Sequence, residues 1–216
     1  MVDMNKWWES YICIAKKIET GGAGNDYSDI NNMKVYVDEF AQYIPVDKYK
    51  RVLNLGAGAG GETKLLLDKG YDVVGITLGR DNVNMSKEKY GVDLVESDMH
   101  ILDFLPNSFD SVFMVQTFEH FLSPFIACME MWRVLRVGGL VYNDMPDPDD
   151  DDMWTIWHTN LMYPRQVKKI FELCGFKEIQ DFSQRHRLRF IFEKLSTDKI
   201  DKWSYLKYIH ELRNKA

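Results

Sequence analysis

From residue 51 onward, the chain alternates short apolar runs with segments whose apolar positions recur at helical spacing. A glycine follows each helical segment where a helix end is expected: Gly70, Gly91 and Gly138. This alternation is typical of βαβ units, which build a mostly parallel sheet with helices on both faces. The predicted strands are Arg51–Leu55, Asp72–Thr77, Val92–Glu96, Phe109–Gln116 and Leu140–Asn143, and the predicted helices are Glu62–Lys69, Asn82–Tyr90 and Pro124–Leu135.

The pattern changes near the C-terminus. A helix predicted from Pro164 to Cys174 is followed by two apolar runs, Phe176–Phe182 and Leu188–Glu193. The basic turn 184–187 between these runs leaves no room for a crossover helix, so they are expected to form an antiparallel hairpin at one edge of the sheet. A final helical stripe, from Ile200 to Leu212, either packs on the core or makes a dimer contact, and we expect a monomer or a homodimer.

Residues 1–48 carry two helical stripes, of which the second runs from Met33 to Ile44 and is closed by Pro45. They are predicted to form an N-terminal helical cap, either a lid over the site or a cover for a sheet edge. The main domain is placed at residues 49–196 and a C-terminal helix at 197–216.

Composition restricts the class of protein further. The 216 residues carry a net charge of −6, which disfavours a general nucleic-acid partner. The three cysteines lie far apart without a CxxC pair, which indicates reduced thiols and argues against a zinc site. No apolar stretch approaches the roughly 18 residues of a membrane span, and the first residues lack the layout of a signal peptide. We therefore expect a soluble, cytoplasmic protein with no membrane partner.

The first predicted strand leads directly into a glycine-rich turn, Gly56 to Gly61. Such a turn between strand and helix lets backbone N–H groups approach an anionic part of a ligand. The run satisfies both GxGxG and GxGxxG, so a nicotinamide cofactor is one alternative. That alternative also requires an acidic residue about 20 positions further on, where this chain has Thr77.

Five ordered blocks carry a resemblance to a known family: Leu53–Gly60, Asp72–Gly79, Glu96–Met99, Phe109–His120 and Trp132–Val141. In this order, over roughly residues 48–193, the chain resembles the class I S-adenosylmethionine-dependent methyltransferases. The resemblance implies a three-layer, Rossmann-like α/β sandwich. Its seven-stranded sheet would have the order 3-2-1-4-5-7-6, with the last strand antiparallel.

The resemblance also implies a role for individual residues in binding S-adenosylmethionine (SAM), which leaves as S-adenosylhomocysteine. Asn54 replaces the family's usual acidic residue near the cofactor ammonium, and Thr77 replaces the carboxylate that usually holds the ribose. Asn82 stands where the cyclopropane-synthase-like branch has a carboxamide, and Asp98 matches the residue that accepts from the adenine amino group. The full cofactor set is Asn54, Gly56, Ala57, Gly58, Gly60, Thr77, Leu78, Asn82, Asp98, Met99 and Gln116.

Two histidines are candidate catalytic bases because an imidazole titrates near neutral pH. Glu119 and His120 resemble the acidic–His pair of small-molecule members, although His120 can equally stabilise the loop. His158 resembles a pocket histidine of the same members. Six aspartates between 144 and 152 suit a cationic acceptor, a divalent ion or simply a solvated loop. We assign no metal ligand.

The sequence therefore predicts a methyltransferase that acts on an O or N atom of a small molecule. Methyl transfer requires mainly that donor and acceptor be aligned in line, so a catalytic signature is not expected. Substitutions at Asn54 and Thr77 leave open a SAM-binding partner or regulatory protein that has lost catalysis. A methyltransferase of RNA or protein is disfavoured by the negative charge.

Overall fold

A computed structural model describes residues 30–155 and 158–199. They form one seven-stranded sheet of order β3-β2-β1-β4-β5-β7-β6, in which β7 runs antiparallel to both of its neighbours. This confirms the predicted fold class and the terminal hairpin. The strands are β1 (Arg51–Leu55), β2 (Asp72–Thr77), β3 (Leu94–Glu96), β4 (Phe109–Val115), β5 (Leu135–Pro146), β6 (Phe176–Asp181) and β7 (Arg187–Lys194).

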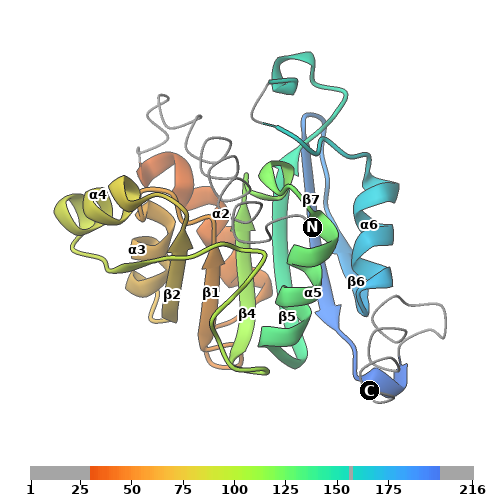
Figure 1. The fold of residues 1–216 in the computed structure, drawn as a ribbon, viewed down its shortest axis with the longest axis horizontal. Coiled ribbons are helices and arrows are strands. Elements are labelled where there is room, and N and C mark those ends of the chain that lie inside the picture. The colour runs from red at the N-terminus through yellow and green to blue at the C-terminus, as the bar shows by residue number, and fades with distance from the viewer. Residues whose placement is uncertain (1–29, 156–157, 200–216) are drawn as a thin grey trace, which may run out of the picture.

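Helices cover both faces of the sheet (Figure 1). On one face, α2 and α3 pack their apolar residues against β1, β4, β5 and β7, with Phe40, Phe113 and Tyr142 in mutual ring contact. On the other face, α5 and α6 build the larger core, where the Phe171 ring stacks on Phe192. The helices are α2 (Ile30–Tyr43), α3 (Gly61–Asp68), α4 (Arg80–Tyr90), α5 (Pro124–Val134) and α6 (Pro164–Leu173).

Gly138 does not end a helix, contrary to the sequence prediction. Helix α5 ends at Val134 and the chain enters β5 at once, so that β5 begins at Leu135 rather than Leu140. Gly138 has φ +74°, and a β-carbon on Gly139 would lie 2.9 Å from the Asp110 carbonyl oxygen. The two glycines therefore allow an irregular start of β5 close beside β4, where the register shifts between Phe109 and Ser111.

The remaining boundaries agree within three residues, and Gly70 and Gly91 do follow helices, both with positive φ. The second N-terminal stripe forms α2, which packs onto the face of the sheet. The first stripe and the stripe Ile200–Leu212 lie outside the described residues. The domain boundaries stay a prediction.

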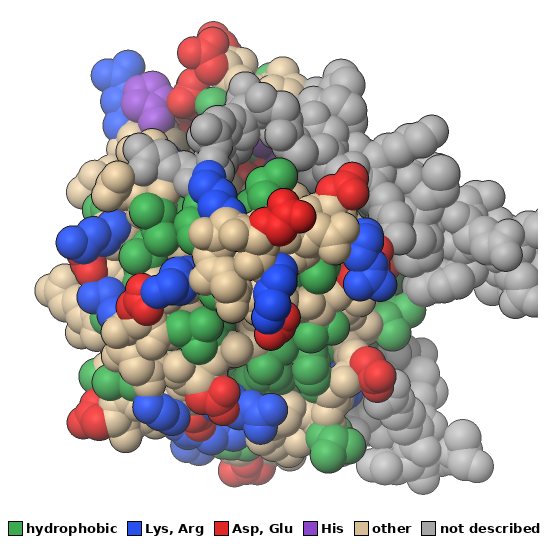
Figure 2. All heavy atoms as spheres, turned by 90° about the vertical axis from the view of Figure 1, so that its left-hand side faces the viewer, with side chains coloured by type: hydrophobic (Ala, Val, Ile, Leu, Met, Phe, Trp, Pro, Cys, Tyr) green, Lys and Arg blue, Asp and Glu red, His purple; other side chains and the backbone are tan. Residues whose placement is uncertain are grey.

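The surface beside α4 and β3 carries charges of both signs (Figure 2). Arg80 pairs with Glu96 at 3.0 Å, and Lys87 pairs with Asp93 at 2.7 Å. Acidic and basic side chains alternate on this face, so it offers no continuous basic stripe to a nucleic acid. Among the described helices, none is both long and apolar enough to cross a membrane.

Candidate active site

The glycine loop lies at the carboxyl edge of the sheet, between β1 and α3 (Figure 1). Gly56, Gly58 and Gly60 all have positive φ, which residues with a side chain rarely adopt. A β-carbon on Gly56 would lie 2.3 Å from Thr117 Oγ1 at the end of β4, so the loop fits closely against that strand. At Gly58 a β-carbon would meet no atom of residues 30–155 or 158–199 within 4 Å, so these residues leave the surface above the middle of the loop open.

Asn54, at the position where a carboxylate is usual, is fully buried near the end of β1. Its amide nitrogen donates to Thr63 Oγ1 of α3 at 2.9 Å. Its amide oxygen has no hydrogen-bond partner in the described part of the chain. A buried acceptor without a donor costs free energy, so this oxygen is a candidate contact for a ligand donor.

The residues predicted for the ribose come together at the end of β2. The Asn82 amide lies 3.3 Å from Thr77 Oγ1, to which it donates a hydrogen bond. Thr77 and Leu78 are both buried, whereas Asn82 is partly exposed. The carboxamide and hydroxyl therefore form one polar pair beside the glycine loop.

Asp98 follows β3 with its side chain mostly buried. One carboxylate oxygen accepts from the backbone N–H of His100 and lies 2.8 Å from His100 Nδ1. The other oxygen has no partner among residues 30–155 and 158–199. Met99 is buried, with its side chain in the main core. Asp98 thus shapes the turn after β3 and retains one free acceptor.

Gln116 ends β4 in a strained backbone conformation, with φ +48°. Its amide donates to Asp144 Oδ1 at 3.1 Å, and its backbone N–H donates to the Asp144 carbonyl at 2.8 Å. Arg187 of β7 donates to the same carboxylate oxygen, while its guanidinium lies over the Tyr36 ring of α2. Burial raises the pKa of Asp144, and the Arg187 charge opposes that rise.

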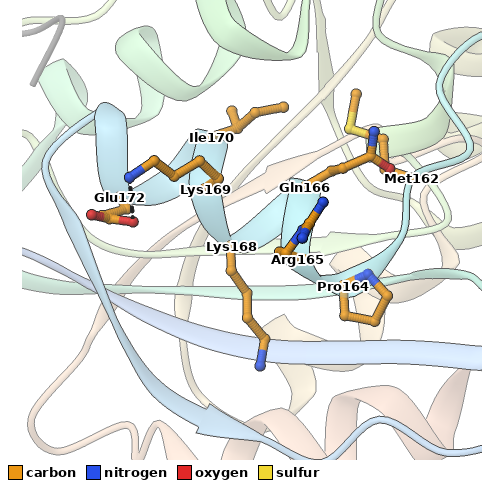
Figure 3. A pocket seen from close by; sticks show the side chains of 8 residues that line it. All are labelled: Met162, Pro164, Arg165, Gln166, Lys168, Lys169, Ile170 and Glu172. Carbon is orange, nitrogen blue, oxygen red and sulfur yellow. Dashed lines mark hydrogen bonds and ion pairs between the residues drawn. The ribbon is translucent and has the colours of Figure 1, made fainter.

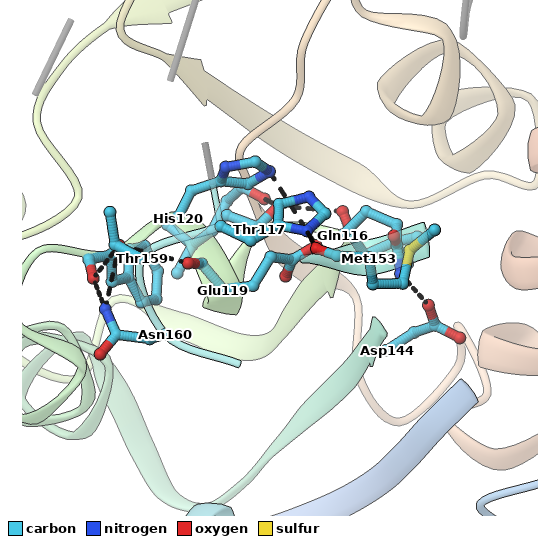
Figure 4. Close-up of polar contacts among 12 residues, drawn as sticks. Gln116, Thr117, Glu119, His120, Asp144, Met153, Thr159 and Asn160 are labelled. Carbon is cyan, nitrogen blue, oxygen red and sulfur yellow. Dashed lines mark hydrogen bonds and ion pairs between the residues drawn. The ribbon is translucent and has the colours of Figure 1, made fainter. Parts of the chain in front are cut away.

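Glu119, His120 and His158 form one cluster, of which Figure 4 labels Glu119 and His120. A ligand atom from each lies within 4.8 Å of the other two, and the two imidazole centroids are 5.0 Å apart. The Glu119 side chain is fully buried, and neither carboxylate oxygen has a hydrogen-bond partner among the described residues. His120 Nε2 lies 3.9 Å from Glu119 Oε1.

Hydrogen bonds between two segments hold this cluster together. The Asn160 backbone N–H donates to the Glu119 carbonyl at 2.9 Å, and the Asn160 amide donates to the Phe121 carbonyl. Thr159 Oγ1 lies within hydrogen-bond distance of both carbonyls. This attachment, which we call the 119–160 clamp, fixes the segment after β5 on the loop after β4. It brings together two histidines that the sequence singled out separately.

Sequence reasoning missed one acidic group in this region, Glu62, and did not anticipate the burial of Glu119. Glu62, in the first turn of α3, is partly exposed, and the pKa of its carboxyl rises to about 8 because of desolvation and the Asp144 charge. The pKa of Glu119 likewise rises to about 8, mainly through burial, with Asp144 adding to the rise. A carboxylate directly after a glycine loop is a sequence signal for Glu62. The sequence singles out Glu119 together with His120, but its full burial follows from tertiary packing.

The aspartate-rich segment after β5 divides into one buried residue and an outer loop. Asp144 alone is fully buried; Asp149, Asp151 and Asp152 are exposed. Trp154 is 63% exposed and donates its indole N–H to the Pro148 carbonyl. Trp157 lies outside the described residues. The described outer part of the loop is thus mostly exposed to solvent, as the solvated-loop alternative predicts.

A shallow groove runs along α6, as Figure 3 shows, lined by Met162, Pro164, Arg165, Gln166, Lys168, Lys169, Ile170 and Glu172. Lys168 is paired with Asp181 at 2.6 Å and with Glu178 at 3.0 Å, and Lys169 is paired with Glu172 at 3.0 Å. Lys168 and Lys169 are therefore already paired with carboxylates. None of the residues that line the groove belongs to the cluster of polar groups at the carboxyl edge of the sheet.

Comparison with known proteins agrees with this geometry. Residues 53–143 match the family described as Methyltransferase domain. The chain is 31% identical, over 144 residues, to a 2-methyl-6-phytyl-1,4-hydroquinone methyltransferase of Synechocystis, which covers 62% of this chain and 43% of that protein. It is 34% identical, over 116 residues, to the ubiquinone/menaquinone biosynthesis C-methyltransferase UbiE of Stenotrophomonas maltophilia, covering 49% and 45% of the two chains.

Among solved structures, the PH0226 protein of Pyrococcus horikoshii has the same fold, with a TM-score of 0.67 and 22% identity over 78% of this chain and 95% of that one. The antiparallel strand inserted between β5 and β6 also departs from the order of dinucleotide-binding sheets, which disfavours the nicotinamide alternative. Sheet order and the family match over residues 53–143 agree in giving the chain the Rossmann-like fold of the class I S-adenosylmethionine-dependent methyltransferases. It spans about half the length of the curated relatives it matches.

Proposed function

We propose that this chain transfers a methyl group from SAM to a hydroxylated small molecule, at oxygen or at a ring carbon made nucleophilic by that hydroxyl. Two relatives are named for quinone or hydroquinone chemistry, and one is named a C-methyltransferase. Removing the proton of a phenolic hydroxyl activates both its oxygen and its ring carbons, so one site can serve either outcome. An N atom is the alternative acceptor. The methyltransferase domain is proposed to span residues 49–196.

The observation that carries this proposal is the set of unsatisfied groups along the carboxyl edge. Within the described part of the chain, Asn54 and Asp98 each keep one buried oxygen without a donor, and a β-carbon on Gly58 would touch nothing. SAM has donors for both oxygens, an ammonium and an adenine amino group. When bound, it supplies a methyl group activated by a positively charged sulfur. The residues present therefore fit this cofactor.

The other predicted cofactor contacts extend along the same edge. Thr77, Leu78 and Asn82 are proposed to meet the ribose, and the backbone of Met99 the adenine. The loop residues Gly56, Ala57, Gly58 and Gly60 are proposed to lie against the methionyl part. Gln116, held by Asp144 at 3.1 Å, is proposed to face the reacting end.

Glu62 is proposed to supply the charge that Asn54 lacks. It stands at the start of α3, directly after the glycine loop, and Asp144 lies close enough to raise its pKa. Two carboxyl groups that repel each other favour a cation between or beside them. The ammonium and sulfonium of SAM are such cations, so Glu62 and Asp144 together give the methionyl end of the site its negative potential.

His120 and His158 are proposed as the catalytic residues, which promote loss of the acceptor's hydroxyl proton. His158 Nδ1 lies 2.5 Å from the Met153 carbonyl oxygen, which can only accept. The ring therefore carries its proton on Nδ1 and keeps the lone pair of Nε2. Glu119 lies 3.9 Å from His120 Nε2, where it can stabilise positive charge in the cluster.

A calorimetric titration with SAM, S-adenosylhomocysteine and NADH tests the proposal, followed by an acceptor screen that measures release of S-adenosylhomocysteine. We expect binding of the two adenosyl ligands alone. Asp98→Ala should weaken their binding at least tenfold, whereas His158→Ala should lower turnover and leave cofactor affinity unchanged. Equal loss of affinity in both variants contradicts this division of the site.

A second candidate function is a SAM-binding partner or regulatory protein without catalysis. The observation in its favour is that Asn54 and Thr77 both lack the usual carboxylate. It predicts cofactor binding with no turnover for any hydroxylated acceptor. Absence of any adenosyl binding would mean that these two positions mark a lost site.

A further inference from the structure

We propose that Glu119, His120 and His158 bind a divalent first-row transition-metal ion at the acceptor side of the site. The donor set is two imidazoles and one carboxylate, with a ligand atom of each within 4.8 Å of the others. Two histidines and a carboxylate are a common ligand set for such ions, and they leave coordination positions open. Ions such as Mg²⁺ and Ca²⁺ prefer ligands made up of oxygen atoms alone.

The Glu119–His120 pair fits a site that closes slightly around an ion, and the other ligand atoms lie within 4.8 Å. Ligand atoms about 2.1 Å from a tetrahedral metal are about 3.4 Å apart. His120 Nε2 and Glu119 Oε1 are 3.9 Å apart, so this pair has to approach by roughly half an ångström. Side-chain rotation achieves such a shift without movement of the backbone, which the 119–160 clamp holds in place.

The buried carboxylate gives an independent reason for a cation here. Both Glu119 oxygens are buried and have no hydrogen-bond partner among the described residues. Buried charges in proteins are normally paired or bind metals, because an isolated one is costly. A metal ion would neutralise the charge of this carboxylate and coordinate its oxygen lone pairs.

His158 also has the outer contact that is typical of a metal ligand. Its Nδ1–H is held by the Met153 carbonyl at 2.5 Å, which leaves Nε2 as the coordinating atom and fixes the ring orientation. Ligating histidines almost always donate their second ring N–H to a carbonyl or a carboxylate in this way. The contact comes from η2 (Asp151–Met153), in the segment that the clamp fixes on the loop after β4.

The ion would act on the acceptor, a use that rests on the methyl transfer proposed above. A hydroxyl group of the acceptor gives its proton to a hydroxide bound to the metal, which leaves as water, and the deprotonated oxygen takes the vacant position. This oxygen, or the ring carbon it activates, then forms a bond to the methyl carbon as the carbon–sulfur bond breaks. The sulfur keeps that electron pair and becomes neutral, and the metal stays divalent throughout. A methylated ring carbon afterwards loses its hydrogen as a proton to water, and the electron pair of that C–H bond restores the aromatic ring.

The test is a metal titration of full-length protein freed of metal by a chelator. Co²⁺ is followed by its visible absorption and Zn²⁺ by calorimetry. We expect one equivalent of Co²⁺ per chain, displaced by Zn²⁺. Glu119→Gln, His120→Asn and His158→Asn should each weaken Co²⁺ binding at least tenfold. Glu119→Gln preserves size and removes a buried charge, so it is expected to fold.

His186→Asn is the matched control, because His186 is half-exposed, lies outside the cluster and pairs with Asp150 at 3.2 Å. It should bind Co²⁺ like the wild type. Absence of binding to the wild type, or equal binding by all three cluster variants, overturns the metal site. A parallel SAM titration of the same samples tests the fold and the cofactor proposal separately. Binding of SAM without Co²⁺ therefore rejects only the metal, and binding of Co²⁺ without SAM rejects only the methyltransferase proposal.

Discussion

The Gly58→Ala substitution tests two roles of Gly58 separately, its backbone conformation in the glycine loop and its proposed contact with the cofactor. Gly58 has φ +48°, and an added β-carbon meets none of the described residues within 4 Å, so the substitution creates no clash with them. The left-handed backbone costs a residue with a side chain about 1–2 kcal/mol. A lower entropy of the unfolded chain returns about 0.4–1 kcal/mol of this. The net loss of stability is about 1 kcal/mol, or roughly 2–4 °C in Tm for a chain of this size.

The effect on ligand binding should be larger than the effect on stability. The new methyl group projects into the open space above the loop, where the methionyl part of SAM is proposed to lie. We expect SAM affinity to fall at least tenfold, which corresponds to about 1.4 kcal/mol. Thermal unfolding and calorimetric titration with SAM and S-adenosylhomocysteine measure the two effects on one preparation.

Gly70→Ala is the matched control for this experiment. Gly70 has φ +91°, its β-carbon would also meet nothing within 4 Å, and it precedes β2 at the opposite edge of the sheet. It should lose a similar amount of stability and keep full SAM affinity. Wild-type affinity in Gly58→Ala, or the same loss of affinity in both variants, refutes the placement of the cofactor over the loop.

Three further predictions concern charge and packing. SAM affinity should rise with pH up to about 8, because the cation prefers the ionised form of Glu62, and calorimetry at several pH values should show that Glu62→Gln flattens this rise. Burial lowers the pKa of Lys194 to about 8, so between about pH 8 and 10.4 the unfolded chain binds more protons than the folded one. The free energy of unfolding should therefore rise with pH in this range. Urea unfolding of Lys194→Met should lack this rise. Phe171→Ala removes a buried ring stacked 3.9 Å from Phe192 and should cost about 3–5 kcal/mol in urea unfolding, while SAM affinity of the folded protein stays unchanged.

The sheet could be predicted because parallel strands that are buried on both faces consist mostly of apolar residues, which is visible in the sequence. Continuous apolar runs such as Phe109–Val115 mark strands covered on both faces, and the short turn before Arg187 excludes a crossover. The prediction failed at Gly138, where a glycine that permits an irregular strand resembles one that ends a helix. Local patterns do not distinguish the two.

The candidate site could be predicted only in part. Asn54, Thr77 and Asp98 occupy expected positions at strand ends, and the structure brings Thr77 and Asn82 into contact. The Glu119 cluster depends on a clamp between residues 40 positions apart in sequence, which no periodicity encodes. Arg187 was part of a basic turn, yet its guanidinium reaches the buried Asp144. Such pairings follow from tertiary packing.

The 119–160 clamp has a consequence for how the protein can be redesigned. Residues 147–155 follow the end of β5 outside the sheet, and Thr159 and Asn160 further along the chain are held by the clamp. A loop whose two ends are held in place tolerates changes of length and composition at a small cost in the free energy of folding. Exchanging the outer aspartates of this loop is therefore a route to new acceptor preferences in engineered variants, provided that Met153 remains as the support for His158.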